Sequence, residues 1–198
     1  MNTDKTIEPH RRGLLALLGR CFMRFSRNRE ASTAIEFTML AVPFSMLVFA
    51  ILESCISFAA QEVMANATDD VARQLRTGQL RAANVTETSL KKAICDRMEI
   101  MVAKGCPDLF VDLKTYATFD LASKVKVKFI AGSGSEKPDL DTNGFLVEPG
   151  GALTKNMLRV FYKWPVITDF MSLAMSNLKG GKTLHFATVT WQNEPFDD

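Results

Sequence analysis

Glu36 is the ionisable residue with the most unusual setting in this sequence, because a long apolar run, Phe37–Ala60, begins directly after it. An ionised carboxylate at membrane depth is costly and is usually paired or functional. If proteolysis removed the basic segment that precedes it, the new N-terminus would carry a free α-amine, which is mostly cationic at neutral pH. The amine of one subunit would then neutralise Glu36 of its neighbour in a staggered array of parallel helices. The alternative is that Glu36 lies in the headgroup zone beside Arg27 and Arg29.

The other polar residues form no pattern typical of catalysis. The sequence contains no Gly-x-Ser-x-Gly elbow, no His-Glu-x-x-His motif and no dinucleotide-binding fingerprint. Of its two histidines, His10 lies in a basic N-terminal segment, and we expect a structural or surface role for His185. The segment Gly132–Ser135 lacks the Lys-Ser/Thr ending of a phosphate-binding loop. We therefore expect no enzyme, no cofactor, no metal and no small-molecule substrate.

The charge distribution excludes a general nucleic-acid binder and points to a membrane signal. The 198 residues include 24 Lys+Arg and 22 Asp+Glu, a net charge of +2, whereas nucleic-acid binding needs a concentrated basic surface. Residues 1–30 hold seven basic and three acidic side chains, a local charge of +4. The other 168 residues have a net charge of −2. With 47% apolar and 23% charged residues, the chain is not intrinsically disordered.

The run Phe37–Ala60 has the length and composition of a membrane span. Eighteen of its 24 residues are apolar, and Glu53 is its one charged residue. As a helix rising about 1.5 Å per residue, it would reach roughly 36 Å and cross a hydrocarbon core of about 30 Å. The basic residues that precede it predict a cytoplasmic N-terminus and an exported C-terminal part. We expect Glu53, near the outer end, to extend toward water.

Two other export signals fit this region less well. A signal peptide has an apolar stretch of about 7–15 residues before a small-residue cleavage site, and Ser57–Ala59 is a weak example of such a site. Leu52–Cys55 resembles a lipoprotein signal, but its charged residue, Glu53, departs from that pattern. The alternatives are therefore a domain released by signal peptidase near Ala59 and a permanently anchored, unprocessed envelope-binding protein.

The junction Arg27–Phe37 resembles the leader junction of type IV prepilins. More narrowly, its sequence Arg-Asn-Arg-Glu-Ala-Ser-Thr-Ala-Ile-Glu-Phe is similar to that of the TadE-like pseudopilins of the tight-adherence (Flp) pilus system. Two C-terminal segments carry the same resemblance. They are the aromatic-basic-Trp-Pro segment Phe161–Pro165 and the terminal strand with its Asn-Glu-Pro-Phe ending, Thr188–Phe196. The spacing of Cys95 and Cys106 is similar as well.

This resemblance implies that a prepilin peptidase cuts between Ala31, where the family usually has Gly, and Ser32. Glu36 is then the fifth residue of the mature chain, and Glu36 and Phe37 act in assembly. The resemblance further implies a single-pass inner-membrane protein whose C-terminal domain is periplasmic and which enters a pilus or pseudopilus. Its partners would be other pilins or pseudopilins and the pilus assembly machinery, in adhesion and secretion.

Cys95 and Cys106 lie on the side of the span that we expect to be exported, where thiols tend to oxidise, so we expect a disulfide between them. Closing a loop of this size contributes on the order of 2–3 kcal/mol. Two unpaired thiols are the alternative. A zinc site is disfavoured, because ten residues separate the cysteines and neither His10 nor His185 forms a cluster with them.

Helical periodicity continues beyond the apolar run and stops before Gly78, which predicts one long helix over residues 33–76. Asn84 and Glu87 have the spacing of a capping box, so a second helix is expected to begin near Asn84 and to end at Gly105. Alternating apolar residues then predict strands at 111–119, 125–129, 158–163 and 183–191.

Pro165 is expected in the first turn of a further helix, since proline is favoured there. The apolar face of that helix comprises Val166, Ile167, Phe170, Met171, Ala174, Met175 and Leu178.

Residues 131–151 contain five glycines and two prolines, which indicates a loop that we expect to be flexible. The predicted fold class is α+β: a long N-terminal transmembrane and amphipathic helix, a second helix and a small antiparallel sheet, as in pilins. The predicted organisation is a basic cytoplasmic leader (1–31), a transmembrane helix (32–60) and an exported head domain (61–198).

Overall fold

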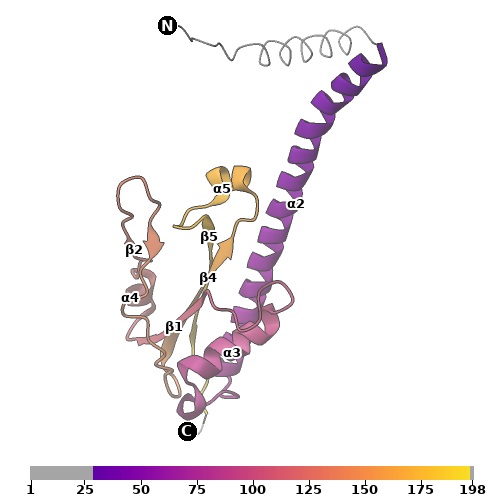
Figure 1. Cartoon of the computed structure of the whole chain (residues 1–198). Helices are drawn as coiled ribbons and strands as arrows, with labels where there is room; N and C mark the ends of the chain where they lie inside the picture. Colours follow the sequence, from indigo (N-terminus) through magenta and orange to yellow (C-terminus); the bar gives the residue numbers. More distant parts are fainter. Residues whose placement is uncertain (1–28, 197–198) are drawn as a thin grey trace, which may run out of the picture. The chain divides into compact units, whose positions relative to one another are not determined.

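The computed structural model describes residues 29–196, in two compact units that divide between Ile51 and Leu52 and are described separately. The predicted leader, residues 1–31, lies outside the described residues as far as residue 28. One long helix, further helices and a small antiparallel sheet confirm the α+β class (Figure 1). In chain order the elements are α2 (Arg29–Arg76), η1 (Ala82–Asn84), α3 (Glu87–Met98), β1 (Leu109–Tyr116), α4 (Phe119–Ser123), β2 (Phe129–Ile130), β3 (Asp139–Leu140), β4 (Lys155–Pro165), α5 (Asp169–Met175) and β5 (Lys182–Gln192).

The long helix α2 confirms the prediction for residues 33–76. It ends before Gly78, whose φ of +71° is a left-handed conformation that favours glycine. A Cβ atom on Gly78 would lie 2.8 Å from the ring of Phe196, so this position has no room for a side chain. The backbone N–H of Glu194 donates to the carbonyl of Arg76 at 3.0 Å. The C-terminal Asn-Glu-Pro-Phe segment thus supplies a donor to one of the carbonyls that a helix end leaves without an intrahelical partner.

The main sheet is antiparallel with the strand order β1-β4-β5. Tyr162 of the central strand β4 lies opposite Leu109 of β1 and His185 of β5, which fixes the register. β4 is buried along nearly its whole length, whereas β5 alternates between buried and exposed residues. Because successive side chains point to opposite faces, a central strand of this kind requires cover on both faces of the sheet.

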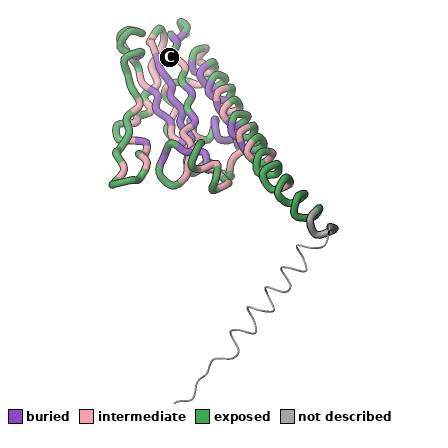
Figure 2. Tube along the Cα trace, turned by 90° about the horizontal axis from the view of Figure 1, so that it is seen from above, coloured by how far each residue is buried: buried purple, intermediate pink, exposed green. Residues whose placement is uncertain are grey.

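The helix-facing side of the sheet forms the main core together with the C-terminal part of α2 and with α3. Figure 2 shows buried residues along the strands and along this part of α2. The helical periodicity predicted beyond the apolar run is confirmed, since Ala67, Val71 and Leu75 of α2 lie in this core. Its least exposed members include Met64, Val71, Leu90, Ile94, Leu113, Leu158 and Val160.

The opposite face of the sheet is covered by the segment between α4 and β4. Phe145 of this segment stacks on Phe161 of β4, and Phe161 stacks on Phe186 of β5, with ring centroids 5.1 and 5.0 Å apart. The loop predicted at residues 131–151 therefore contains the short strand β3 and contributes side chains to the packing of the sheet.

A buried ion pair crosses the two strands beneath this cover. Asp112 of β1 lies directly opposite Arg159 of β4. The Nε and Nη2 atoms of Arg159 donate to Oδ2 of Asp112 at 3.0 and 2.5 Å. The other carboxylate oxygen accepts the backbone N–H of Leu146 at 3.0 Å. The two charged side chains are 1% and 7% exposed, so the pair is almost fully removed from water.

Residues on both edges of the three-stranded sheet are hydrogen-bonded to segments outside the sheet. On β1, the backbone of Leu113 donates to the carbonyl of Leu146 and accepts the N–H of Glu148, both at 2.8 Å. On β5, the amide side chain of Gln61 in α2 donates to the carbonyl of Phe186 at 2.8 Å and accepts its N–H at 3.2 Å. A loop and a helix side chain thus take hydrogen bonds that a further strand would otherwise form.

The capping box predicted from Asn84 and Glu87 is wrong by two residues. Thr86 is the N-cap of α3: its hydroxyl accepts the N–H of Ser89 at 3.2 Å, and the Ser89 hydroxyl accepts the N–H of Thr86 at 2.8 Å. A serine replaces the usual Glu or Gln of this motif, which hides the motif from a pattern search. α3 ends at Met98, before Gly105.

The predicted strand at 125–129 is also wrong over most of its length. Residues 124–128 form no strand, and only Phe129–Ile130 pairs, with β3. Alternation of lysine with apolar residues is not sufficient for a strand, because a strand also needs a neighbouring strand to pair with. The helix α4 replaces the end of the first predicted strand, and Thr118 caps it by accepting the N–H of Leu121 at 3.2 Å.

Pro165 is the last residue of β4, opposite Lys182, and is not in the first turn of a helix. A proline is tolerated at the end of a strand because its missing N–H interrupts no ladder there. α5 begins four residues later, at Asp169.

Candidate functional site

The predicted processing and assembly residues lie together at the start of α2. The peptide bond between Ala31 and Ser32 is within the first turn of the helix, and Glu36 and Phe37 follow one turn later. Glu36 is exposed, and the side chain of Phe37 is 72% exposed. Because Ser32 and Glu36 are four residues apart, they lie on the same side of the helix.

The apolar side chains that follow Phe37 in α2 are exposed as well (Figure 2). From Thr33 to Leu52 the helix rises about 30 Å, which equals the thickness of a bilayer's hydrocarbon core. By length and composition, α2 is the one helix within residues 29–196 that could cross a membrane. The large exposed members of this surface are Phe37, Met39, Leu40, Val42, Phe44, Met46, Leu47, Phe49, Ile51 and Leu52.

Glu53 marks the point at which the head begins to contact α2. The expectation that its side chain extends toward water is wrong, because the residue is only 7% exposed. Its Oε1 accepts the backbone N–H of Ile167 at 2.5 Å and that of Thr168 at 3.3 Å, and its Oε2 accepts the hydroxyl of Thr168. These donors come from the turn that leads into α5, more than 110 residues away in the sequence. No local pattern around Glu53 could have indicated them.

One turn further along α2, Ser57 contacts the second buried polar residue of the head, His185. The Ser57 hydroxyl and Nε2 of His185 are 3.0 Å apart, and the imidazole stacks on Trp164 with ring centroids 5.4 Å apart. The Nδ1 atom is buried without a hydrogen-bond partner among the described residues. Burial lowers the pKa of His185 from 6.5 to about 4, so the ring is neutral at neutral pH. The role of His185 is therefore structural.

This neutral histidine predicts a loss of stability in acid. Between pH 6.5 and about pH 4 the unfolded chain takes up a proton on His185 that the folded chain does not. Above pH 6.5 the residue therefore has no effect on stability. As the pH is lowered from 6.5 to about 4, the free energy of unfolding decreases by on the order of 3 kcal/mol. Urea unfolding of the full chain in detergent micelles, followed by tryptophan fluorescence at several pH values, measures this. His185→Phe keeps a ring against Trp164 and should reduce the loss of unfolding free energy between pH 6.5 and 4. An equal loss in both proteins would show that His185 is not the group responsible.

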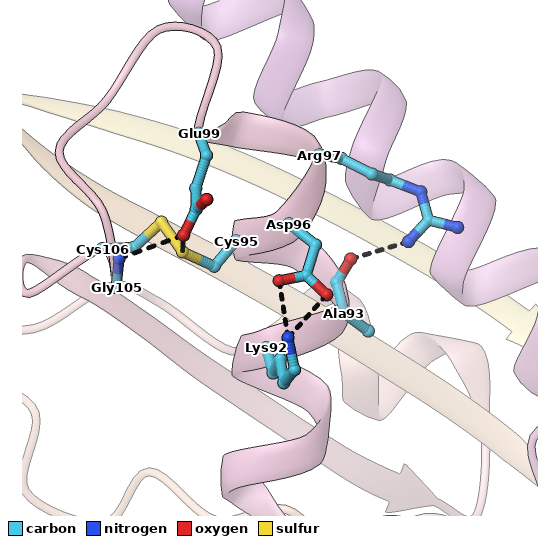
Figure 3. Close-up of polar contacts among 8 residues, drawn as sticks. All are labelled: Lys92, Ala93, Cys95, Asp96, Arg97, Glu99, Gly105 and Cys106. Carbon is cyan, nitrogen blue, oxygen red and sulfur yellow. Dashed lines mark hydrogen bonds and ion pairs between the residues drawn. A yellow bond between two sulfur atoms is a disulfide. The ribbon is translucent and has the colours of Figure 1, made fainter.

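The predicted disulfide is confirmed: Cys95 of α3 is bonded to Cys106 in the loop that follows, with Cα atoms 5.8 Å apart (Figure 3). Glu99 of the same turn accepts the backbone N–H of Gly105 at 3.2 Å. Gly105 and Cys106 both have positive φ, +76° and +43°, so the chain reverses sharply at the bond. The disulfide thus joins the C-terminal end of α3 to the approach to β1.

The two C-terminal segments of the sequence resemblance lie on adjacent, paired strands, β4 and β5. Trp191 donates its indole N–H to Oδ1 of Asn193 at 2.7 Å. The Asn193 amide donates to the carbonyls of Gly150 and Gly151, both at 2.8 Å. Both segments therefore stabilise the head, and neither forms a catalytic constellation. Within residues 29–196, no three His, Cys, Asp or Glu side chains are grouped so that they could hold a metal ion.

Comparison with known families agrees with the N-terminal part of this description. The family model described as TadE-like protein matches residues 31–73, which cover the Ala31–Ser32 bond, Glu36 and most of α2. The resemblance expected from the leader junction is confirmed over this segment. No curated protein and no solved structure matches the chain.

Proposed function

We propose, from the TadE-like character of residues 31–73, that this chain is a membrane-anchored minor pseudopilin that acts in assembly of a Flp, or tight-adherence, pilus. The observation that carries the proposal is the position of Glu36 at the inner end of about 30 Å of exposed apolar helix. A permanent anchor needs the apolar helix but not a carboxylate at this depth, whereas a helix that packs against copies or relatives has a use for it.

The proposed topology places the basic leader in the cytoplasm and the head in the periplasm, with one crossing of the inner membrane. The charge of +4 in residues 1–30 supports this orientation through the positive-inside rule. The disulfide between Cys95 and Cys106 agrees with an oxidising compartment for the head. The chain acts as a structural component in this proposal and has no catalytic activity of its own.

In the assembly step, the α-amine that cleavage creates on Ser32 pairs with Glu36 of a neighbouring subunit. An ion pair that is shielded from water by lipid or by other helices is strong when both partners are present and costly when one is missing. It therefore sets the stagger of adjacent helices. The proposed partners are a prepilin peptidase, other pilins or pseudopilins and the assembly machinery.

Mass spectrometry of the N-terminus of the protein recovered from membranes tests this function. A mature chain that starts at Ser32 is the expected result. A chain that still starts at Met1 would indicate a permanent anchor, and one that starts at Ala60 would indicate a secreted domain; either result contradicts the proposal. The variant Ala31→Gly serves as the matched control, because it introduces the residue usual in the family and should be cut at the same bond.

A further inference from the structure

The short helix α5 exposes an apolar face that the head does not cover. Ile167, Phe170 and Leu173 are 75%, 40% and 86% exposed, and Ala174 is exposed beside them. Phe170, Leu173 and Ala174 are three and four residues apart and lie on one side of the helix, and Ile167 lies in the turn just before it. α5 has no fully buried residue, although the sequence around it is strongly apolar. Three large apolar side chains gathered on one short element form the kind of patch that marks an interaction site.

Residues at both ends of α5 contact α2 directly after Leu52. Glu53 accepts the N–H groups of Ile167 and Thr168 before α5, and the hydroxyl of Ser54 lies 3.7 Å from the sulfur of Met175 at its end. Both ends of α5 are thus tied to residues directly after Leu52. These α2 residues directly follow, along the chain, the 20 residues from Thr33 to Leu52, which as a helix are long enough to cross a hydrocarbon core.

The neighbouring part of α2 is also apolar on its open side. Ile56 and Phe58 are 45% and 71% exposed, although residues between and beside them contact the head. The two surfaces, on α2 and on α5, belong to elements that are hydrogen-bonded to each other. Both elements thus expose apolar residues near the contacts that join them.

The charged groups around α5 are compatible with a lipid surface. Lys137 donates to the carbonyls of Ser172 and Ser176 at the C-terminal end of the helix, at 3.2 and 2.8 Å. These bonds satisfy carbonyls that a helix end leaves free. Lys179 pairs with Glu136 at 2.9 Å. Asp169 is the one charged residue within α5, so the exposed stripe itself carries no charge.

We propose that the apolar stripe of α5, defined by Ile167, Phe170, Leu173 and Ala174, inserts into the outer leaflet of the membrane beside α2. The occupant is lipid: the headgroup and upper acyl region into which amphipathic helices bury their apolar face by about 5–10 Å. The inference rests on the proposed membrane anchor. It adds a second membrane contact, which fixes the tilt and rotation of the head above the bilayer before the subunit enters an assembly.

Site-directed labelling of the full chain in lipid vesicles tests this contact. Leu173→Cys carries an environment-sensitive fluorophore, in a background where Cys21 and Cys55 are replaced by serine. Lipids with a quencher near the headgroup should reduce its fluorescence, because an apolar face inserted to this depth lies within reach of such a quencher. Ile100→Cys is the matched control: its side chain is 83% exposed, like Leu173, but it follows Arg97, which contacts Asp70 some 17 residues further along α2. It should not be quenched.

A third label separates failure of this inference from failure of the anchor. Met46→Cys lies in the middle of the apolar run and should be quenched by lipids labelled deep in the acyl chain. If Met46 is quenched while Leu173 behaves like Ile100, the lipid contact of α5 is overturned and the anchor stands. If Met46 is not quenched, the proposed anchor itself fails. Shielding of Leu173 from an aqueous quencher only when other pilus subunits are present would also overturn the lipid contact, in favour of a protein partner.

Discussion

Asp112→Ala is expected to destabilise the head by about 3–5 kcal/mol, because it leaves the guanidinium of Arg159 buried without its carboxylate. The guanidinium of Arg159 lies against the stacked rings of Phe145 and Phe161, 5.7 and 5.8 Å from their centroids, so it cannot turn toward water without disrupting that packing. The same substitution removes the acceptor of the Leu146 N–H and loosens the cover of the sheet. Urea unfolding of the full chain in detergent micelles, followed by the fluorescence of Trp164 and Trp191, measures the loss.

The matched control is Asp120→Ala. Asp120 pairs with Lys124 at 2.6 Å, but both side chains are 68% exposed, and exposed pairs of this kind contribute about 0–1 kcal/mol. The double variant Asp112→Leu with Arg159→Met should recover much of the loss, since no unpaired charge remains buried. A loss below about 1 kcal/mol for Asp112→Ala would mean that the pair is not buried in solution.

Glu36→Gln is expected to abolish incorporation of the subunit into a pilus while leaving membrane insertion and cleavage intact. The substitution keeps the shape of the side chain but removes the charge that, in the proposed assembly, neutralises a neighbour's Ser32 amine. An amine left unpaired at membrane depth costs on the order of 3 kcal/mol, which weakens each subunit contact by roughly a hundredfold. Co-purification of the subunit with pilus components, together with counts of surface pili, measures the effect.

Glu62→Gln is the control for this prediction, because Glu62 is an exposed acid on the same helix, beyond the apolar run. It should assemble normally. Normal assembly of Glu36→Gln would show instead that Glu36 serves only as a headgroup contact, and it would remove the case for pairing.

Local patterns in the sequence predicted the features that depend on near neighbours along the chain. The extent of α2 follows from its apolar periodicity and from Gly78 after its end. The pairing of Cys95 with Cys106 spans a single turn and a short loop, so composition and compartment were enough to predict it. The strands at 158–163 and 183–191 were each found, though two to five residues too short, because their alternation is long and their partners are strong.

Features that depend on partners far along the chain could not be predicted. The burial of Asp112 is one example, since nothing local reveals that Arg159 lies opposite it in β4 and that Phe145 lies against this arginine. The expectation for Glu53 was wrong for the same reason, because its hydrogen-bond donors lie far along the chain, near α5. The strand predicted at 125–129 was wrong for the opposite reason: the alternation is present, but only Phe129 at its end pairs with a neighbouring strand.

The hydrogen bonds at Gln61 and Leu113 affect how copies of a chain with the proposed membrane anchor associate with one another. Sheets with open borders readily join to one another, and lateral crowding would promote such joining long before any ordered fibre grew. Here Phe186 is engaged by Gln61 on one border, and the backbone around Val147 occupies the other. At these positions the backbone is already hydrogen-bonded within the same chain, which disfavours joining of the sheet to that of another copy.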